Sequence, residues 1–295
     1  MTQKKLLMII NPRAGRNKPL GPMFEACSIL SAAGYLLSIR KTAGSGDAAR
    51  IAREEGGDYD LVVAVGGDGT LNETVNGLAA LASPPPLGYL AQGSTNDFAS
   101  SLHISDRPAE AAAAMMGKAP RQLDIGDWNG RKFIYVASFG AFTRSSYSAP
   151  QAAKNALGHF AYILEGMKDL NTLRPYKVKI TADSEVLDGE YLFGAVCNST
   201  SLGGLMKLDP DRVVLDDGRF EMLLIPMPKS PADLPNLVRS LLDQKYDRGG
   251  LIFRHVSSVH VETEENLPWS LDGEYAASTP VVNIQNCQKG LTMLL

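Results

Sequence analysis

Residues 61–78, with the sequence LVVAVGGDGTLNETVNGL, determine the fold expected for the first part of the chain. The stretch opens with a short apolar run rich in β-branched residues, which is typical of a buried strand in a parallel sheet. Three glycines, Gly66, Gly67 and Gly69, then interrupt the run, and helical spacing of apolar residues resumes over residues 71–78. A strand, a glycine turn and a helix in this order predict one βα unit of an α/β domain.

The glycine turn of residues 66–69 suits a phosphate group. Glycines let a ligand approach the backbone closely, and the start of a helix presents free N–H groups and the positive end of its dipole. Thr70 is expected as the N-cap of that helix, with Glu73 completing a capping box. Asp68 would repel phosphates unless a divalent cation lay between them. The turn therefore predicts a nucleotide site with a cation at Asp68, and a plain glycine turn with a solvated Asp68 is the alternative.

The composition of the chain is that of an ordinary globular protein. Its 295 residues favour two domains, and 44% of them are hydrophobic and 21% charged. The net charge is −3 and the Lys and Arg residues form no run, so nucleic acid is not expected as a partner. The three cysteines, Cys27, Cys197 and Cys287, are far apart, which argues against a disulfide framework and a cysteine zinc site.

No segment of the sequence has the pattern of an exported or membrane-spanning protein. The apolar run near the N-terminus is too short for a signal peptide core, and no stretch approaches the roughly 20 apolar residues of a membrane span. The sequence therefore predicts a cytoplasmic protein. If its substrate is a lipid, the protein is expected to associate only transiently with the membrane surface, as a peripheral enzyme.

The first domain, residues 1–124, is expected to alternate strands with helices. Strands are expected at residues 5–10, 35–40, 61–65 and 87–90, and helices at residues 20–33, 47–55 and 107–116. This alternation predicts a parallel, doubly wound sheet with right-handed crossovers. Because ligands bind beyond the carboxyl ends of such strands, the loops that begin at Asn11, Thr42, Gly66 and Gly93 are expected to meet at one edge.

The second part of the chain, residues 125–283, has mostly the pattern of strands. They are expected at residues 132–138, 176–182, 191–197, 219–225, 256–262 and 281–285. Alternating apolar residues and Asp-Gly turns predict antiparallel sheets packed as a β-sandwich. Helices are expected at residues 152–170 and 232–243, and the apolar face of the first either covers a sheet or faces lipid.

Several motifs of the chain resemble those of the diacylglycerol kinase catalytic-domain family. The sequence GGDGTLNE at residues 66–73 resembles the nucleotide-binding signature of that family, which includes soluble bacterial diacylglycerol kinases and the sphingosine and ceramide kinases. Further likenesses lie in NPRAG at residues 11–15, GSTNDFA at residues 93–99 and QLDIG at residues 122–126. The shorter string GGDGT is shared with NAD kinases, so it indicates the wider group rather than the substrate. In the family the end of the chain, here residues 284–295, returns to the first domain.

The resemblance implies an ATP-dependent kinase of lipid alcohols with Mg²⁺ as cofactor. The simplest reaction is conversion of diacylglycerol to phosphatidate in phospholipid biosynthesis. The implied nucleotide-binding residues are Asn11, Pro12, Arg13, Ala14, Gly15, Thr42, Gly66, Gly67, Asp68, Gly69, Thr70, Asn72, Glu73, Ser94 and Thr95. Asp68 would face the cation at the phosphates, and Asp97 and Asp124 would lie behind Asp68 without binding the cation directly. The resemblance also implies a second, structural Mg²⁺ on a turn, bound by the Asp217 carboxylate and the carbonyls of Val214 and Arg219.

The sequence Leu-Asp-Gly-Glu occurs twice, and the family has its catalytic glutamate in such a segment. The copy at residues 187–190 has the pattern of a hairpin, with Asp188-Gly189 in the turn and Glu190 solvated. The copy at residues 271–274 lies where the chain is about to return to the first domain, which would bring its carboxylate to a cleft between the domains. We therefore expect Glu274 to be the general base, with Asp272 supporting it and Asp68 as the alternative base.

Other functions remain open at this point. An NAD kinase would share GGDGT and the sandwich, but the extended GGDGTLNETVNG, the STNDFA loop and the LDGE segment resemble the lipid branch instead. A sphingoid-base kinase would share these longer motifs. A non-catalytic nucleotide-binding regulator is disfavoured because both Asp68 and Glu274 are present. The chain contains neither a GxSxG elbow nor a GxxxxGK[ST] string, so acyl transfer and a P-loop site are not predicted. The lipid tail and the oligomeric state, a homodimer included, cannot be derived from these motifs.

Overall fold

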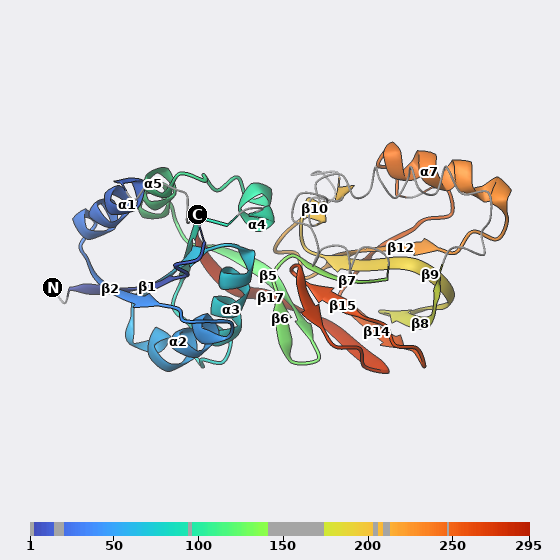
Figure 1. Ribbon diagram of the computed structural model, residues 1–295, viewed down its shortest axis with the longest axis horizontal. Helices are drawn as coiled ribbons and strands as arrows, with labels where there is room; N and C mark the ends of the chain where they lie inside the picture. Colours follow the sequence, from blue (N-terminus) through green and yellow to red (C-terminus); the bar gives the residue numbers. More distant parts are fainter. Residues whose placement is uncertain are drawn as a thin grey trace. The chain divides into compact units, whose positions relative to one another are not determined.

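The chain is divided into two compact units (Figure 1). The computed structural model describes residues 3–14, 21–93, 96–140, 174–202, 206–208, 213–246 and 248–295. Unit 1 is made of Met1–Ile125 with Lys289–Leu295, and unit 2 is Gly126–Gln288. The chain passes from one unit to the other twice, once within β5 (Arg121–Trp128) and once within β17 (Val281–Leu294).

Unit 1 contains a parallel sheet with the strand order β17-β4-β3-β1-β2. Its other strands are β1 (Lys4–Ile10), β2 (Tyr35–Lys41), β3 (Leu61–Gly66) and β4 (Leu87–Ala91). β3 and β4 are buried along their full length, as expected for strands covered on both faces. This sheet is the doubly wound α/β architecture that the sequence predicts.

Helices cover both faces of this sheet. They are α1 (Gly21–Ala32), α2 (Asp47–Glu55), α3 (Asp68–Leu78), α4 (Asp97–Ser101) and α5 (Pro108–Gly117), and the 3-10 helix Gly56–Asp58 follows α2. Figure 1 shows α1 and α5 on one face and α2 and α3 on the other. The core on the first face joins Leu30 of α1 and Met115 of α5 to strand residues such as Leu6, Val63 and Leu90.

Unit 2 is an antiparallel β-sandwich organised around the long strand β9 (Glu185–Cys197). The first half of β9 pairs with β8 (Tyr176–Ala182), and its second half pairs with β7 (Val136–Gly140) and β12 (Phe220–Pro226). One strand therefore pairs with three others. The remaining elements are β6 (Arg131–Phe133), β10 (Ser201–Leu202), β11 (Met206–Lys207), the 3-10 helix Pro231–Asp233, α7 (Leu234–Leu242), β13 (Ile252–Val256), β14 (Ser258–Glu262), β15 (Trp269–Leu271) and β16 (Glu274–Ala276).

Aromatic side chains fill the centre of the sandwich. The ring of Trp269 is fully buried, and its centroid lies 5.0 Å from that of Phe139 and 6.0 Å from that of Trp128. Gly126 belongs to the same region, because a Cβ at this position would lie 2.0 Å from the ring of Phe133. The glycine of the LDIG segment is therefore required by packing rather than by a turn.

Two predicted strands prove to be interrupted. Residues 132–138 are divided into β6 and β7, and residues 256–262 contain the end of β13 and all of β14. At each break the side chain of a distant aspartate accepts backbone hydrogen bonds, Asp272 at the first and Asp183 at the second. The prediction of continuous strands was wrong because alternation of apolar residues does not reveal side chains that compete for backbone donors.

The last strand is longer than the predicted residues 281–285. β17 continues to Leu294, because its end pairs in parallel with β4 at Met293 and Leu294 and so completes the sheet of unit 1. The predicted helix at residues 232–243 begins as a 3-10 turn, and the predicted helix at residues 152–170 lies outside the described residues. In the part of the chain that the structure describes, no helix is long and apolar enough to cross a membrane.

Candidate functional site

The glycine turn leads directly from β3 into α3. The helix begins at Asp68 with Gly67 as its N-cap, three residues earlier than the predicted N-cap Thr70, so Thr70 lies within its first turn. The predicted capping box of Thr70 and Glu73 is wrong, since the Glu73 carboxylate accepts hydrogen bonds from another helix. Asp68 instead brings a carboxylate to the first position of α3, where the helix dipole stabilises a negative charge.

Gly67 of this turn and Gly93 of the loop after β4 lie against each other. A Cβ at Gly93 would lie 2.6 Å from Cα of Gly67, so the two backbones are in direct contact. A Cβ at Gly66 would lie 2.5 Å from the hydroxyl oxygen of Thr70. Both distances are shorter than real Cβ atoms tolerate, so a side chain at Gly93 would push the two loops apart and one at Gly66 would displace Thr70.

The Asp68 carboxylate lies at the Tyr89 hydroxyl, beside the glycine turn. The backbone N–H of Asp97 donates to Oδ2 of Asp68 over 3.0 Å, and the Tyr89 side chain is hydrogen-bonded to Asp68 as well. Burial raises the pKa of Tyr89 far above its usual value, and the negative charges of Asp68 and Asp97 raise it further. This site of negative potential next to backbone N–H groups suits a divalent cation carrying phosphates.

The other loops at this edge are joined to the turn by hydrogen bonds. The Asn11 side chain donates to Oγ1 of Thr70 over 3.2 Å, and the Asn11 backbone N–H donates to Val65 O over 2.9 Å. Thr42 is buried, and its N–H donates to Ile10 O over 2.9 Å. The predicted meeting of these loops at the carboxyl edge is confirmed. Gly15, Ser94 and Thr95 lie outside the described residues.

Two further predicted site residues have partners within unit 1. Asn72 is buried in α3, where its carbonyl oxygens accept from the Asn76 side chain over 2.9 and 3.1 Å. Asp124 is buried in β5, and its Oδ1 accepts from the backbone N–H of Lys289 over 2.7 Å. Asp124 therefore ties β5 to β17 where both strands leave unit 1, a structural role that the sequence does not reveal.

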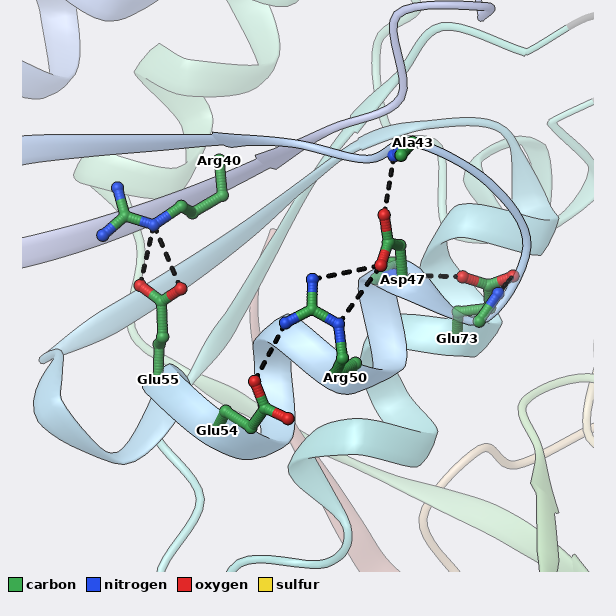
Figure 2. A network of polar contacts seen from close by, with 9 residues as sticks. Arg40, Ala43, Asp47, Arg50, Glu54, Glu55 and Glu73 are labelled. Atoms are coloured by element: carbon green, nitrogen blue, oxygen red, sulfur yellow. Dashed lines mark hydrogen bonds and ion pairs between the residues drawn. The ribbon is translucent and has the colours of Figure 1, made fainter.

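Carboxylates also hold the loop between β2 and α2, as Figure 2 shows. The backbone N–H of Ala43 donates to Oδ2 of Asp47 over 2.7 Å, while Glu73 of α3 accepts from Gly46 N over 2.7 Å and from Ala48 N over 3.2 Å. The pKa of Asp47 is lowered, mostly by the hydrogen bond from the Ala43 N–H and to a smaller extent by the hydrogen bond from Arg50. Arg50 also forms an ion pair with Glu54 on the outer face of α2.

In unit 2 the second Leu-Asp-Gly-Glu copy forms the tight turn between β15 and β16. Leu271 pairs with Glu274, and the two residues between them, Asp272 and Gly273, have φ of 50° and 84°, as in a type I′ turn. Asp272 is only 3% exposed, and its carboxylate accepts the N–H groups of residues 134, 135 and 136 over 2.7, 3.0 and 3.0 Å. Glu274, in contrast, is exposed.

The first Leu-Asp-Gly-Glu copy has a different conformation. Residues 187–190 lie inside β9, where Asp188 pairs with Lys179 and Glu190 with Lys177 of β8. The predicted turn at Asp188-Gly189 is therefore wrong. The β8–β9 turn lies at Asp183 and Ser184, because Asp183 adopts a φ of 49° and binds the backbone of Ser257 and Ser258. Glu190 is exposed, as expected.

The predicted structural cation turn contains hard oxygen donors within a few residues. The exposed Asp217 accepts from the Arg219 N–H over 2.9 Å, and Gly218 has a φ of 82° that closes the turn. One carboxylate with the carbonyls of Val214 and Arg219 and several waters would fit Mg²⁺. Among the described residues no three His, Cys, Asp or Glu side chains gather as a metal-binding group, so such a site would depend on backbone oxygens.

A buried carboxyl group close to this turn was missed by sequence reasoning. Glu221 lies in β12 and is 2% exposed, and its Oε2 has no hydrogen-bond partner among the described residues. Nε2 of His255 lies 3.8 Å from Oε1. Burial raises the pKa of Glu221 to about 8, with a smaller contribution from the charge of Asp217. The only signal in the sequence is a glutamate within the otherwise apolar strand FEMLLIP.

Glu221→Gln is expected to make the folded protein more stable at pH 8 than the wild type. Because the pKa of Glu221 is raised on folding, its contribution to stability is present below its unfolded pKa and is lost as the pH rises toward 8. Glutamine keeps the shape without the charge, so the gain should be about 1–3 kcal/mol at pH 8 and smaller at pH 5. Denaturant unfolding at both pH values measures it, and Glu264→Gln, at an exposed position, is the control. Equal shifts in both variants would contradict the prediction.

Comparisons with known proteins cover nearly the whole chain. The family model of the diacylglycerol kinase catalytic domain matches residues 5–128, and that of the YegS C-terminal NAD kinase beta sandwich-like domain matches residues 136–293. A diacylglycerol kinase of Bacillus subtilis (strain 168) is 36% identical over 283 residues, which cover 94% of this chain and 92% of the relative. One from Staphylococcus aureus (strain MRSA252) is 32% identical over 289 residues, covering 97% and 91%.

Solved structures agree with this likeness. The crystal structure of a diacylglycerol kinase from Bacillus anthracis superposes with a TM-score of 0.80 at 27% sequence identity. The superposition covers 100% of this chain and 98% of that chain. Both units of the present chain thus have counterparts in a protein of similar length.

Proposed function

Since the chain belongs to the diacylglycerol kinase catalytic-domain family, it is a lipid kinase, and we propose that it transfers the γ-phosphoryl group of ATP to diacylglycerol, forming phosphatidate. The observation that carries this proposal is the Asp68 carboxylate at the N-terminus of α3, which the backbone N–H of Asp97 holds in place. Phosphoryl transfer needs positioning and charge neutralisation more than covalent chemistry. A glycine turn at a helix N-terminus, with a carboxylate beside it, supports both requirements.

The loops at the carboxyl edge of unit 1 would bind ATP. Backbone N–H groups of the glycine turn and of the first turn of α3 would donate to the phosphates. The loop after β1 lies beside them, because the Asn11 side chain is hydrogen-bonded to Thr70. Asp68 is the residue that would hold Mg²⁺, supported by Asp97. When bound there, the cation neutralises the charge of the phosphates.

Glu274 would act as the general base on the lipid hydroxyl. Its carboxylate is exposed at the start of β16, so it is accessible to a substrate, and its turn is fixed by the three hydrogen bonds of Asp272. A base must lie within hydrogen-bond reach of the proton that it takes. We propose that the lipid hydroxyl approaches Glu274 from a membrane surface to which the enzyme binds transiently.

A substrate panel tests this function. Labelled ATP is incubated with the protein and with mixed micelles of diacylglycerol, a sphingoid base, ceramide or a polyprenol, and separately with NAD. We expect label on diacylglycerol and none on NAD. Label on the sphingoid base alone would keep a lipid kinase but change its substrate, and label on NAD alone would overturn the proposal.

The cation turn gives a prediction that can be measured without turnover. Mg²⁺ is expected to raise the melting temperature of the wild type, because a ligand that binds only the folded state stabilises it. Asp217→Ala should lower the melting temperature and remove its dependence on Mg²⁺, whereas Asp188→Ala, at an exposed position of β9, should retain it. Identical wild-type melting with and without Mg²⁺ would mean that the structural cation site is absent.

A further inference from the structure

We infer that Glu73 is a positioning residue for the nucleotide, which acts by fixing the loop of residues 42–46 and not by touching the nucleotide itself. The inference rests on the proposed function, because it assumes that the carboxyl edge of unit 1 binds ATP. The sequence motif alone suggests a direct contact for Glu73. The hydrogen bonds of its carboxylate indicate an indirect role.

The loop of residues 42–46 has little of its own to hold it in one conformation. After the buried Thr42 it consists of the small residues Ala43, Gly44, Ser45 and Gly46. A Cβ at Gly44 or Gly46 would have nothing within 4 Å, so no packing constrains the chain at these glycines. A glycine-rich segment loses much conformational entropy when it becomes ordered. Its order must therefore come from hydrogen bonds to other elements.

Glu73 and Asp47 provide those hydrogen bonds at the two ends of the loop. Both oxygens of Glu73 are used: Oε1 accepts from Gly46 N over 2.7 Å and from Ser45 Oγ over 3.3 Å, and Oε2 accepts from Ala48 N over 3.2 Å. At the other end Asp47 accepts from Ala43 N. Hydrogen bonds to a charged acceptor are about twice as strong as neutral ones, so the two carboxylates clamp the loop (Figure 2).

The contact of Glu73 with α2 is rigid because α3 and α2 pack without space between them. A Cβ at Gly77 of α3 would lie 2.3 Å from Ala49 O and 2.7 Å from the Ala52 side chain. This close approach fixes the position of α3 along α2, and with it the position of Glu73 at the N-terminus of α2. Since the Glu73 carboxylate already occupies that N-terminus, a phosphate would find its N–H donors at the N-terminus of α3 rather than at that of α2.

Three side chains in the first turns of α3 each hold a different loop. Asp68 accepts from Asp97 N, Thr70 accepts from the Asn11 side chain, and Glu73 accepts from Gly46 N. α3 is therefore the element that sets the mutual positions of the predicted nucleotide loops. Removing the Glu73 carboxylate would release only one of them, so nucleotide affinity should fall while the phosphoryl transfer step keeps its own groups.

The test compares Glu73→Gln with Glu54→Gln, a matched change at an exposed glutamate that pairs only with Arg50 among the contacts described above. ATP affinity is measured by titration without lipid, and KM and kcat are measured with diacylglycerol micelles. Glu73→Gln should raise the Kd and KM for ATP roughly tenfold, with kcat changed less than about twofold. Hydrogen exchange of the Gly46 and Ala48 amides should become faster. Glu54→Gln should match the wild type.

The inference has a second, independent variant. Asp47→Asn weakens the hydrogen bond at the other end of the loop and should also raise the Kd for ATP. If Glu73→Gln does not fold, an unchanged Kd for ATP in Asp47→Asn would show that the clamped loop does not position the nucleotide. Unchanged ATP affinity in the folded variant, or a loss of kcat at constant KM, would overturn the inference. Wild type that binds ATP but labels no lipid would refute the proposed function, and the titration would still test Glu73. Wild type that binds no ATP would refute both.

Discussion

Replacement of Glu274 by glutamine is expected to abolish most of the phosphoryl transfer while ATP still binds. Glutamine preserves the length and the hydrogen-bonding shape of the side chain but cannot take a proton from the lipid hydroxyl. General-base catalysis of this kind contributes typically about 10²–10⁴-fold to the rate. Because Glu274 is exposed and the turn is held by Asp272, the variant should fold like the wild type.

The chain contains its own control for this experiment. Glu190→Gln changes the same residue type in the same four-residue sequence. Glu190, however, lies inside strand β9, where it pairs with Lys177 of β8, and does not follow a turn. Its turnover should remain close to that of the wild type. Initial rates with diacylglycerol micelles and the Kd for ATP are measured for both variants. If Glu190→Gln were inactive and Glu274→Gln active, the base would have been assigned to the wrong copy.

Asp68→Ala is expected to lower kcat on the order of 100-fold or more. It removes a carboxylate from the start of α3, where we place Mg²⁺ and the phosphates, and such electrostatic stabilisation is often worth about that factor. The N–H of Asp97 also loses its acceptor, so Asp68→Asn is the companion variant that keeps an oxygen near this donor. If the charge is what matters, Asp68→Asn should lower kcat about as much as Asp68→Ala does.

Controls separate this effect from unfolding. Asp58→Ala removes an exposed aspartate of the 3-10 helix after α2 and should not change turnover. Circular dichroism and thermal melting of Asp68→Ala should show a folded protein, since the apolar side chains of β3 and α3 are unchanged. A folded Asp68→Ala protein with a rate near that of the wild type would exclude Asp68 from the mechanism.

The sequence predicts the fold well where structure depends on local patterns. The architecture of unit 1 follows from three local features: the buried apolar run of β3, the glycines before α3 and the loops after the parallel strands. Each can be recognised in the sequence, because the spacing of apolar residues and the residue types of turns are local properties. α2 is found over the predicted residues. The likeness of GGDGTLNE to a family motif supplied the candidate residues, which no periodicity would have identified.

The roles of particular side chains depended on contacts between distant residues. The segments 187–190 and 271–274 have the same four residues, yet one is a strand and the other a turn. What differs is the surroundings: Asp183 forms the turn before the first copy, and Asp272 binds a segment more than a hundred residues earlier in the chain. Glu73 likewise finds its donors across a helix interface. No local rule predicts such partners.

The return of the chain through β17 has a consequence for folding during synthesis. Until residues 289–295 leave the ribosome, the sheet of unit 1 lacks the strand that pairs with β4, and that strand must wait until the whole of unit 2 has been made. A nascent chain that still lacks these residues would present the open edge of β4 to other unfolded chains. Unit 1 therefore cannot complete its sheet as an independent first product of translation, even though most of its residues are made before unit 2.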